Sequence, residues 1–196
     1  MHFGLSEEQS LLQESITRFL SDQIPLDEVR KVVDGDRPES DVWAGLVDLG
    51  IPGLLITEAN GGLGLSTLDA TIVAESLGYH VTPSPFLSSA AIAPVVLQSA
   101  EKHEDLLGSV AVGDTRVGVA FSEAIGARHE KAIVSRNGKL HGKSLFALDT
   151  EADCYLVATP DKKIYLVQSN AEGLERKALP TVDRTRSTCE LAYSGV

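Results

Sequence analysis

Side chains whose types and spacing could do chemistry are few and scattered in this chain of 196 residues. The five histidines share no spacing typical of metal ligands, and the sequence suggests no Ser/His/Asp or Cys/His arrangement. Cys154 and Cys189 lie in apolar, strand-like runs, so we expect them to pack in a core. Glu58 and Glu75 are expected to be solvated or capping groups. No catalytic residue and no metal site are therefore assigned.

One glycine-rich stretch, residues 61–64, has the composition of a phosphate-binding loop. Such a loop follows a strand, opens a helix, and carries either the dinucleotide-binding spacing of glycines or a Lys-Ser/Thr pair. This stretch has neither feature. We therefore interpret it as a structural turn.

Composition excludes several partner classes. Lys and Arg number 17 against 28 Asp and Glu, a net charge of −11, which disfavours nucleic acid and anionic membrane as partners because both need a cationic surface. The apolar runs, such as residues 90–97, are far shorter than the roughly 20 residues that span a bilayer. No signal peptide is visible at the start, and two cysteines make no disulfide framework. We expect a reduced, cytoplasmic protein.

The chain changes character after residue 113. Residues 1–113 contain 5 basic and 17 acidic residues, whereas residues 114–196 contain 12 and 11. In the first region, a capping-box sequence at residues 6–9 and apolar residues at helical spacing predict helices. These helices are expected to start at Ser6, Asp41, Ser66, Ser88 or Ser89, and His103, with Pro25 ending the first and Pro94 kinking the fourth.

In the second region, the apolar residues have the pattern typical of strands. Short runs rich in β-branched and aromatic residues begin at Val117, Ala132, Lys139, Cys154, Ile164 and Thr188. Asn137-Gly138 predicts a type I′ hairpin turn. Helices followed by strands, rather than alternating with them, exclude a doubly wound nucleotide fold. The predicted fold class is α+β, with an all-α domain at 1–113 and a small antiparallel β-barrel or sandwich at 114–196.

Several segments in this order resemble the acyl-CoA dehydrogenase family. The resemblance is most specific at residues 48–58, 61–69 and 75–78. It continues at residues 120–123, where the family has Thr-Glu-Pro, at 141–143 with Phe146, and at 183–186, which is similar to the Asp-x-Thr-Arg of bacterial members. It implies FAD as cofactor and an acyl-CoA thioester as substrate. A carboxylate then removes the α-proton while the β-hydrogen leaves as hydride to the flavin.

The resemblance also implies which residues contact FAD. Phe121 and Ser122 lie where the family's backbone and a threonine hydroxyl bond the pyrimidine edge of the flavin. Phe146 lies near the position of the aromatic residue against the flavin ring. From the residues alone, Ser122 is equally a strand-end hydroxyl bonded to nearby backbone, and Phe146 is a core residue of the barrel. Glu123 corresponds to a structural glutamate of the loop, not to the catalytic base.

Two positions depart from the family pattern. Arg128 stands near the serine that meets the FAD pyrophosphate, and we expect its guanidinium either to bind phosphate or to be a solvated loop cation. Leu148 stands where a flavin-bonding threonine is expected, and its side chain cannot hydrogen-bond. FAD binding by this chain is therefore expected to be weak, completed by a partner, or absent.

The family's C-terminal helical bundle, which carries the catalytic carboxylate, has no counterpart up to Val196. The predicted function is a FAD-dependent acyl-CoA dehydrogenase of lipid catabolism, incomplete in this chain, which passes electrons to an electron-transfer flavoprotein and forms homo- or hetero-oligomers. The alternatives are a non-catalytic subunit of a heteromeric acyl-CoA dehydrogenase complex and a free-standing acyl-CoA-binding module. For a chain without this bundle, we expect an exposed apolar patch that includes Val119 and Phe121.

Overall fold

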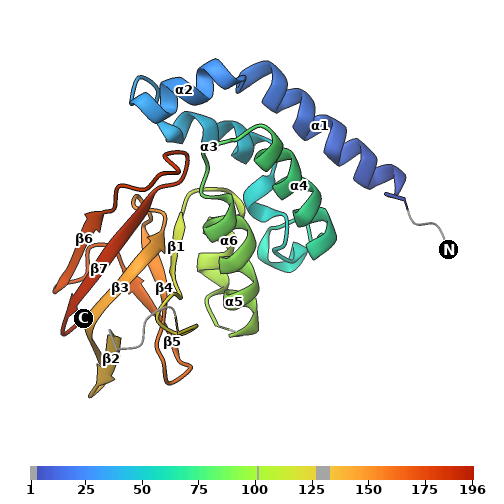
Figure 1. The fold of residues 1–196 in the computed structure, drawn as a ribbon. Helices are drawn as coiled ribbons and strands as arrows, with labels where there is room; N and C mark the ends of the chain where they lie inside the picture. Colours follow the sequence, from blue (N-terminus) through green and yellow to red (C-terminus); the bar gives the residue numbers. More distant parts are fainter. Residues whose placement is uncertain (1–3, 101, 127–132) are drawn as a thin grey trace. The chain divides into compact units, whose positions relative to one another are not determined.

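The structure is a computed structural model that describes residues 4–100, 102–126 and 133–196. It divides into two compact units, Met1–Gly113 and Asp114–Val196, each described here by itself (Figure 1). The first unit is helical and the second is built on a sheet. The predicted α+β class, helices first and strands second, is confirmed.

The helical unit contains α-helices joined by short 3-10 and π-helical turns. Its α-helices are α1 (Glu7–Gln23), α2 (Leu26–Asp34), α3 (Glu39–Asp48), α4 (Thr67–Tyr79), α5 (Ala93–Ser99) and α6 (Glu104–Ala111). The 3-10 turns are η1 (Ile51–Gly53) and η2 (Glu58–Asn60), and η3 (Phe86–Ile92) is a π-helix. The core of this unit includes five fully buried side chains, Leu20, Val42, Leu46, Leu54 and Val73.

Two predicted helix starts are confirmed by their caps. Ser6 accepts a hydrogen bond from Gln9 N, and the Gln9 side chain accepts one from Ser6 N. Ser66 caps α4 in the same way with Asp69 in the third position. Such reciprocal caps satisfy backbone N–H groups that no helical carbonyl can reach.

Other helix boundaries differ from the prediction, and each difference involves a proline. Pro25 follows the end of α1 and is also the residue at the N-terminal boundary of α2, a helix that the apolar pattern did not predict. Pro38, rather than Asp41, precedes α3. The expected kinked helix is a π-helix followed by α5, whose first turn contains Pro94. Ile92 and Ala93 before it are both in the right-handed helical region, so Pro94 stands where the π-helix passes directly into α5.

The glycine-rich stretch is a structural turn, as predicted. Gly61 has φ +81, a left-handed value that favours glycine. A Cβ on Gly62 would lie only 2.2 Å from the carbonyl oxygen of Ile56. The turn follows η2 and no strand, so its backbone amides are not arranged at the end of a strand as a phosphate loop requires.

The second unit contains a seven-stranded mixed sheet. Its strands are β1 (Val117–Ala120), β2 (Ile133–Arg136), β3 (Lys139–Leu148), β4 (Cys154–Ala158), β5 (Ile164–Gln168), β6 (Leu174–Ala178) and β7 (Thr188–Ser194). The order is β5-β4-β1-β3-β7-β6, and β2 pairs with β3. The β2–β3 turn has positive φ at both Asn137 and Gly138, as a type I′ turn requires.

Three details of the sheet differ from the expected antiparallel barrel or sandwich. β1 and β4 run parallel, with Val117 opposite Cys154 and Ala120 opposite Val157. The strand order of the described residues does not close on itself. β6 was not expected, because its sequence Leu-Glu-Arg-Lys-Ala lacks an alternating apolar pattern. That composition suits the edge of a sheet, where charged side chains discourage further pairing.

Candidate functional site

The loop that follows β1 carries two of the expected flavin contacts. β1 ends at Ala120, and Phe121 and Ser122 begin a turn in which both are half-buried. The hydroxyl of Ser122 donates a hydrogen bond of 2.5 Å to the carbonyl oxygen of Leu145. The Ser122 hydroxyl is therefore bonded to backbone, but its partner is distant in sequence and not the nearby backbone that the alternative interpretation expected.

Phe146 lies on a bulge in β3. In the pairing of β3 with β7, the register is regular up to Ser144 and shifts before Ala147. Phe146 has φ +55 and its side chain is 57% exposed, whereas Ser144 and Ala147 are fully buried. The alternative that Phe146 is a core residue is wrong, because the bulge turns it out of the alternating pattern.

The structure brings the loop after β1 and the bulge of β3 together. Ser122 and Phe146 are linked through Leu145, which accepts the serine hydrogen bond and precedes the phenylalanine. Leu148, two residues further on, lies half-buried opposite Val119 of β1. Arg128 lies outside the described residues.

Glu123 is a nearly buried carboxylate beside these residues, at 5% exposed. Its Oε1 accepts a hydrogen bond of 3.3 Å from the backbone N–H of Leu145. Burial raises the pKa of the nearby Tyr193 phenol, and the negative charge of Glu123 adds a smaller contribution in the same direction. The geometry agrees with the expectation that Glu123 is structural. No pattern in the sequence predicted the bulge in β3 that Glu123 supports.

The apolar surface near this site differs from the expected patch. Val119 is 3% exposed and belongs to the interior of the sheet unit. The large apolar side chains exposed on this part of the chain are instead Phe146 and Ile125, the latter at 80%. We therefore centre the candidate site on Phe146.

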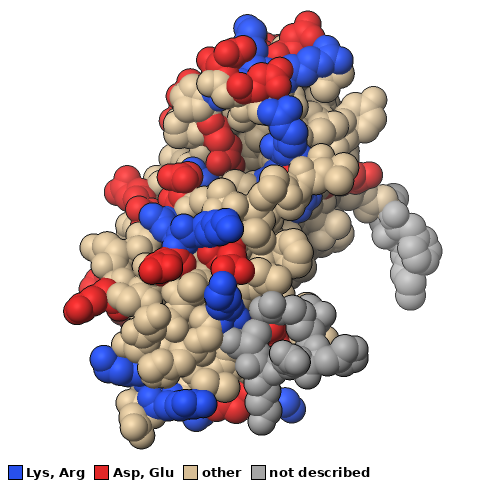
Figure 2. Space-filling model, turned by 60° about the vertical axis from the view of Figure 1, so that its left-hand side comes forward, with Lys and Arg blue, Asp and Glu red and all other residues tan. Residues whose placement is uncertain are grey.

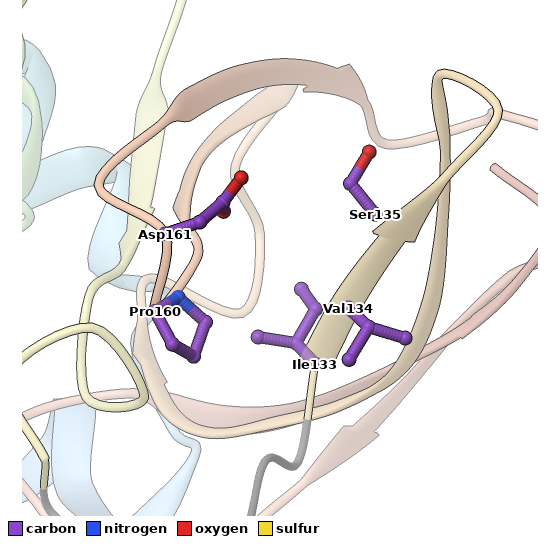
Figure 3. Close-up of a pocket in the computed structure, with 5 residues that line it drawn as sticks. All are labelled: Ile133, Val134, Ser135, Pro160 and Asp161. Carbon is purple, nitrogen blue, oxygen red and sulfur yellow. The ribbon is translucent and has the colours of Figure 1, made fainter.

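Hollows also lie elsewhere among the described residues. One, of about 290 Å³, is lined by Ile133, Val134 and Ser135 of β2 and by Pro160 and Asp161 of the turn after β4 (Figure 3). The Asp161 carboxylate accepts a hydrogen bond from Thr159 and pairs with Lys163, and these interactions lower its pKa, the Thr159 bond most. None of the expected site residues lines this hollow, and we assign it no function.

Another hollow is an apolar groove of about 350 Å³ in the helical unit. It runs between α4, η3 and α5, and the side chains of Ala70, Leu87 and Val95 are among its lining. The lining includes no charged residue.

Within the described ranges, no group of three or more His, Cys, Asp or Glu side chains could hold a metal ion. The same residues include no helix both long and apolar enough to cross a membrane. On the face shown in Figure 2, acidic and basic side chains of the described residues are interspersed and do not gather into one basic surface.

Sequence comparison decides the family. A sequence profile of the acyl-CoA dehydrogenase N-terminal domain matches residues 6–114, more than half of the chain. The chain belongs to the acyl-CoA dehydrogenase family. A curated relative, acyl-CoA dehydrogenase IpdE2 of Mycolicibacterium smegmatis, is 30% identical over 104 residues, which make up 52% of this chain and 33% of that protein.

Several solved structures share the fold of this chain. The ChsE4-ChsE5 complex from Mycobacterium tuberculosis has a TM-score of 0.85 at 23% identity, covering 100% of this chain and 56% of that chain. A variant of the Tcur3481-Tcur3483 steroid ACAD has a TM-score of 0.83 at 26% identity, covering 97% and 55%. The FAD complex of PigA has a TM-score of 0.82 at 20% identity, covering 100% and 57%. The chain thus spans little more than half the length of these solved relatives.

FAD is the cofactor that the family resemblance implies, and some of the described residues offer groups that could contact it. Phe146 offers an exposed aromatic ring for the flavin. The Ser122 oxygen, although its hydrogen is given to Leu145, keeps lone pairs that can accept a hydrogen bond. Leu148 offers an apolar contact only.

Proposed function

We propose that this chain forms part of a FAD-dependent acyl-CoA dehydrogenase, which oxidises the α,β bond of an acyl-CoA thioester. The observation that carries the proposal is the exposed Phe146 ring on the β3 bulge, held beside the loop that contains Ser122. Membership of the acyl-CoA dehydrogenase family supports the reaction class. An exposed phenylalanine in a position disfavoured for its backbone needs a reason, and contact with a flat cofactor supplies one.

In this proposal the residues of the chain bind and orient. Phe146 would lie against the flavin ring, and Ser122 and the Phe121 backbone would meet its pyrimidine edge. FAD, when bound, supplies the redox chemistry by accepting hydride. No described residue is assigned as the base that removes the α-proton. An electron-transfer flavoprotein would be the electron acceptor, as the family resemblance implies.

The second candidate is a non-catalytic subunit of a heteromeric acyl-CoA dehydrogenase. Two solved relatives are themselves pairs of differently named chains, ChsE4-ChsE5 and Tcur3481-Tcur3483. Leu148 also favours this candidate, because an apolar side chain cannot provide the hydrogen bond expected at that position. In this case the chain would shape a flavin or acyl-CoA site that a homologous subunit completes.

Titration of the purified chain with FAD tests the first proposal. We expect a flavin absorbance change, and a loss of affinity of about 2- to 10-fold in Phe146→Ala, as removal of an aromatic contact of about 0.5–1.5 kcal/mol predicts. The matched control is Ile164→Ala, an apolar side chain 48% exposed on β5, which should leave affinity unchanged. Equal affinities for wild type and Phe146→Ala would contradict the proposed contact.

Co-purification distinguishes the two candidates. A chain that binds FAD alone, and gains acyl-CoA oxidation with an artificial electron acceptor when a homologous subunit is added, supports the enzyme. A colourless chain that binds a homologous subunit, without adding a flavin to the complex, supports the non-catalytic subunit.

A further inference from the structure

Both backbone groups of Leu145 are bonded by two consecutive side chains of the loop after β1. Ser122 Oγ donates to the Leu145 carbonyl oxygen at 2.5 Å, and the Leu145 N–H donates to Glu123 Oε1 at 3.3 Å. These residues lie more than 20 positions apart along the chain. One peptide segment of β3 is thus held from two sides by one short loop.

We call these two hydrogen bonds the clamp; they lie at the bulge where the pairing of β3 with β7 shifts register. Ser144 pairs with Leu191 of β7 and Ala147 with Cys189, so the two residues between them face a single residue of β7. A bulge of this kind leaves the extra residue out of the hydrogen-bonded ladder. Backbone groups that lose ladder partners need others when they are shielded from water. Ser122 and Glu123 provide them.

The clamp directly precedes a strained residue. Phe146 has φ +55, a left-handed backbone conformation that is uncommon and strained for a bulky L residue. The residue as a whole is 57% exposed, so packing around its side chain does not account for this conformation. The surroundings that hold Phe146 are therefore on its backbone side, where Glu123 is nearly buried and bonded to Leu145.

We infer that Ser122 and Glu123 are positioning residues that fix the Leu145 backbone and thereby hold the exposed Phe146 ring in place for the flavin. The flavin part of this inference rests on the proposed function, whereas the clamp itself does not. Glu123 acts only through Leu145 and Phe146. Ser122 is expected both to act in this way and to meet the flavin edge.

The decisive measurement is amide hydrogen exchange at Leu145 and Phe146 in the intact chain, followed by NMR. In Glu123→Ala we expect exchange of the Leu145 amide to accelerate at least about 10-fold, because its acceptor is lost. Glu123→Gln keeps an oxygen acceptor and should restore most of the protection. The control is Lys143→Ala, which removes a partly exposed ion pair with Glu190 on the same two strands and should leave exchange of both amides unchanged.

The Ser122 variants make the inference testable even if Glu123→Ala fails to fold. Ser122→Ala should accelerate hydrogen exchange of the same two amides. Ser122→Thr, which keeps a hydroxyl, should retain their protection. Unchanged exchange in both Ser122→Ala and Glu123→Ala would overturn the clamp.

FAD titration of the same variants tests the positioning role. We expect Glu123→Ala to weaken FAD binding in the wild-type background and to have little further effect in Phe146→Ala, since Glu123 acts through that ring. An equal effect in both backgrounds would overturn positioning. Accelerated exchange in a chain that binds no FAD at all would overturn the proposed function while leaving the clamp established.

Discussion

The guanidinium of Arg116 donates two parallel hydrogen bonds to the carboxylate of Asp149, at 2.9 and 2.7 Å. The Asp149 side chain is 1% exposed and that of Arg116 14%. The Arg116 backbone N–H donates to Asp153, and the Tyr155 hydroxyl donates to the Asp149 carbonyl oxygen. This pair therefore ties the segment before β1 to the segment between β3 and β4.

Arg116→Ala should destabilise the sheet unit by about 3–5 kcal/mol. Removing one partner of a buried pair leaves the carboxylate of Asp149 without its counter-charge in a site that water does not reach. The free energy of unfolding in urea, followed by circular dichroism, measures this effect. The control is Arg186→Ala, because Arg186 and Asp183 are both more than half exposed and 3.6 Å apart, and such pairs contribute about 0–1 kcal/mol. Similar losses for the two variants would contradict a special role for Arg116.

Ser66→Ala should lower the free energy of unfolding by about 1 kcal/mol, the usual effect of losing an N-cap side chain. Ser66 Oγ donates to Asp69 and accepts from its backbone N–H. The Ser66 hydrogen bond is also the main cause of the lowered pKa of Asp69. The stabilisation by ionised Asp69 should therefore be present above about pH 4 and fade as pH falls further. Ser99→Ala, at an exposed helix end, should stay within about 0.5 kcal/mol of wild type.

Gly62→Ala and Gly78→Ala make the same change with opposite expected results. A Cβ on Gly62 would lie 2.2 Å from the Ile56 carbonyl oxygen, so the turn must shift, and overpacking of this kind costs about 1–3 kcal/mol. A Cβ on Gly78, within α4, meets nothing within 4 Å. Because alanine favours helix, that variant should be neutral or more stable by up to about 1 kcal/mol. Urea unfolding of both variants checks the difference, and a stable Gly62→Ala would contradict the tight turn.

Stability should fall as pH rises from about 9 to 11. Burial raises the pKa of the Cys154 thiol to about 11, against 9.0 when exposed. As pH rises, the unfolded chain therefore releases this proton at a lower pH than the folded chain does. The free energy of unfolding falls by up to about 3 kcal/mol across that range. Burial raises the pKa of Tyr155 and Tyr193 as well, which adds to the loss in the same direction.

Urea unfolding at pH 8 and pH 10.5 measures this alkaline loss. Cys154→Ala should show a smaller decline between the two pH values than wild type, although its stability at pH 8 is lower because a core side chain is truncated. An equal decline in wild type and variant would show that the thiol does not contribute.

Local features of the fold were predictable from the sequence because neighbouring residues determine them. The caps of α1 and α4 depend on residues three positions apart. The β2–β3 turn depends on the two residues Asn137 and Gly138. The order of helices before strands follows from the change in apolar period after Gly113, since period alone distinguishes the two kinds of element.

The candidate site could be predicted only in part. The resemblance at residues 120–123 and at Phe146 indicated the segments, but periodicity alone placed Phe146 in the core. The bulge that exposes it depends on the register of β3 against β7, which no local pattern in β3 specifies.

Sequence by itself determined the two-part organisation, the turns and the capped helices, because each depends on residues close together along the chain. Only the tertiary structure decided the parallel pairing of β1 with β4 and the hydrogen bonds of Ser122 and Glu123 to Leu145. These join residues that lie more than 20 positions apart. Their partners are chosen by how the strands pair, and that choice depends on the packing of the whole sheet.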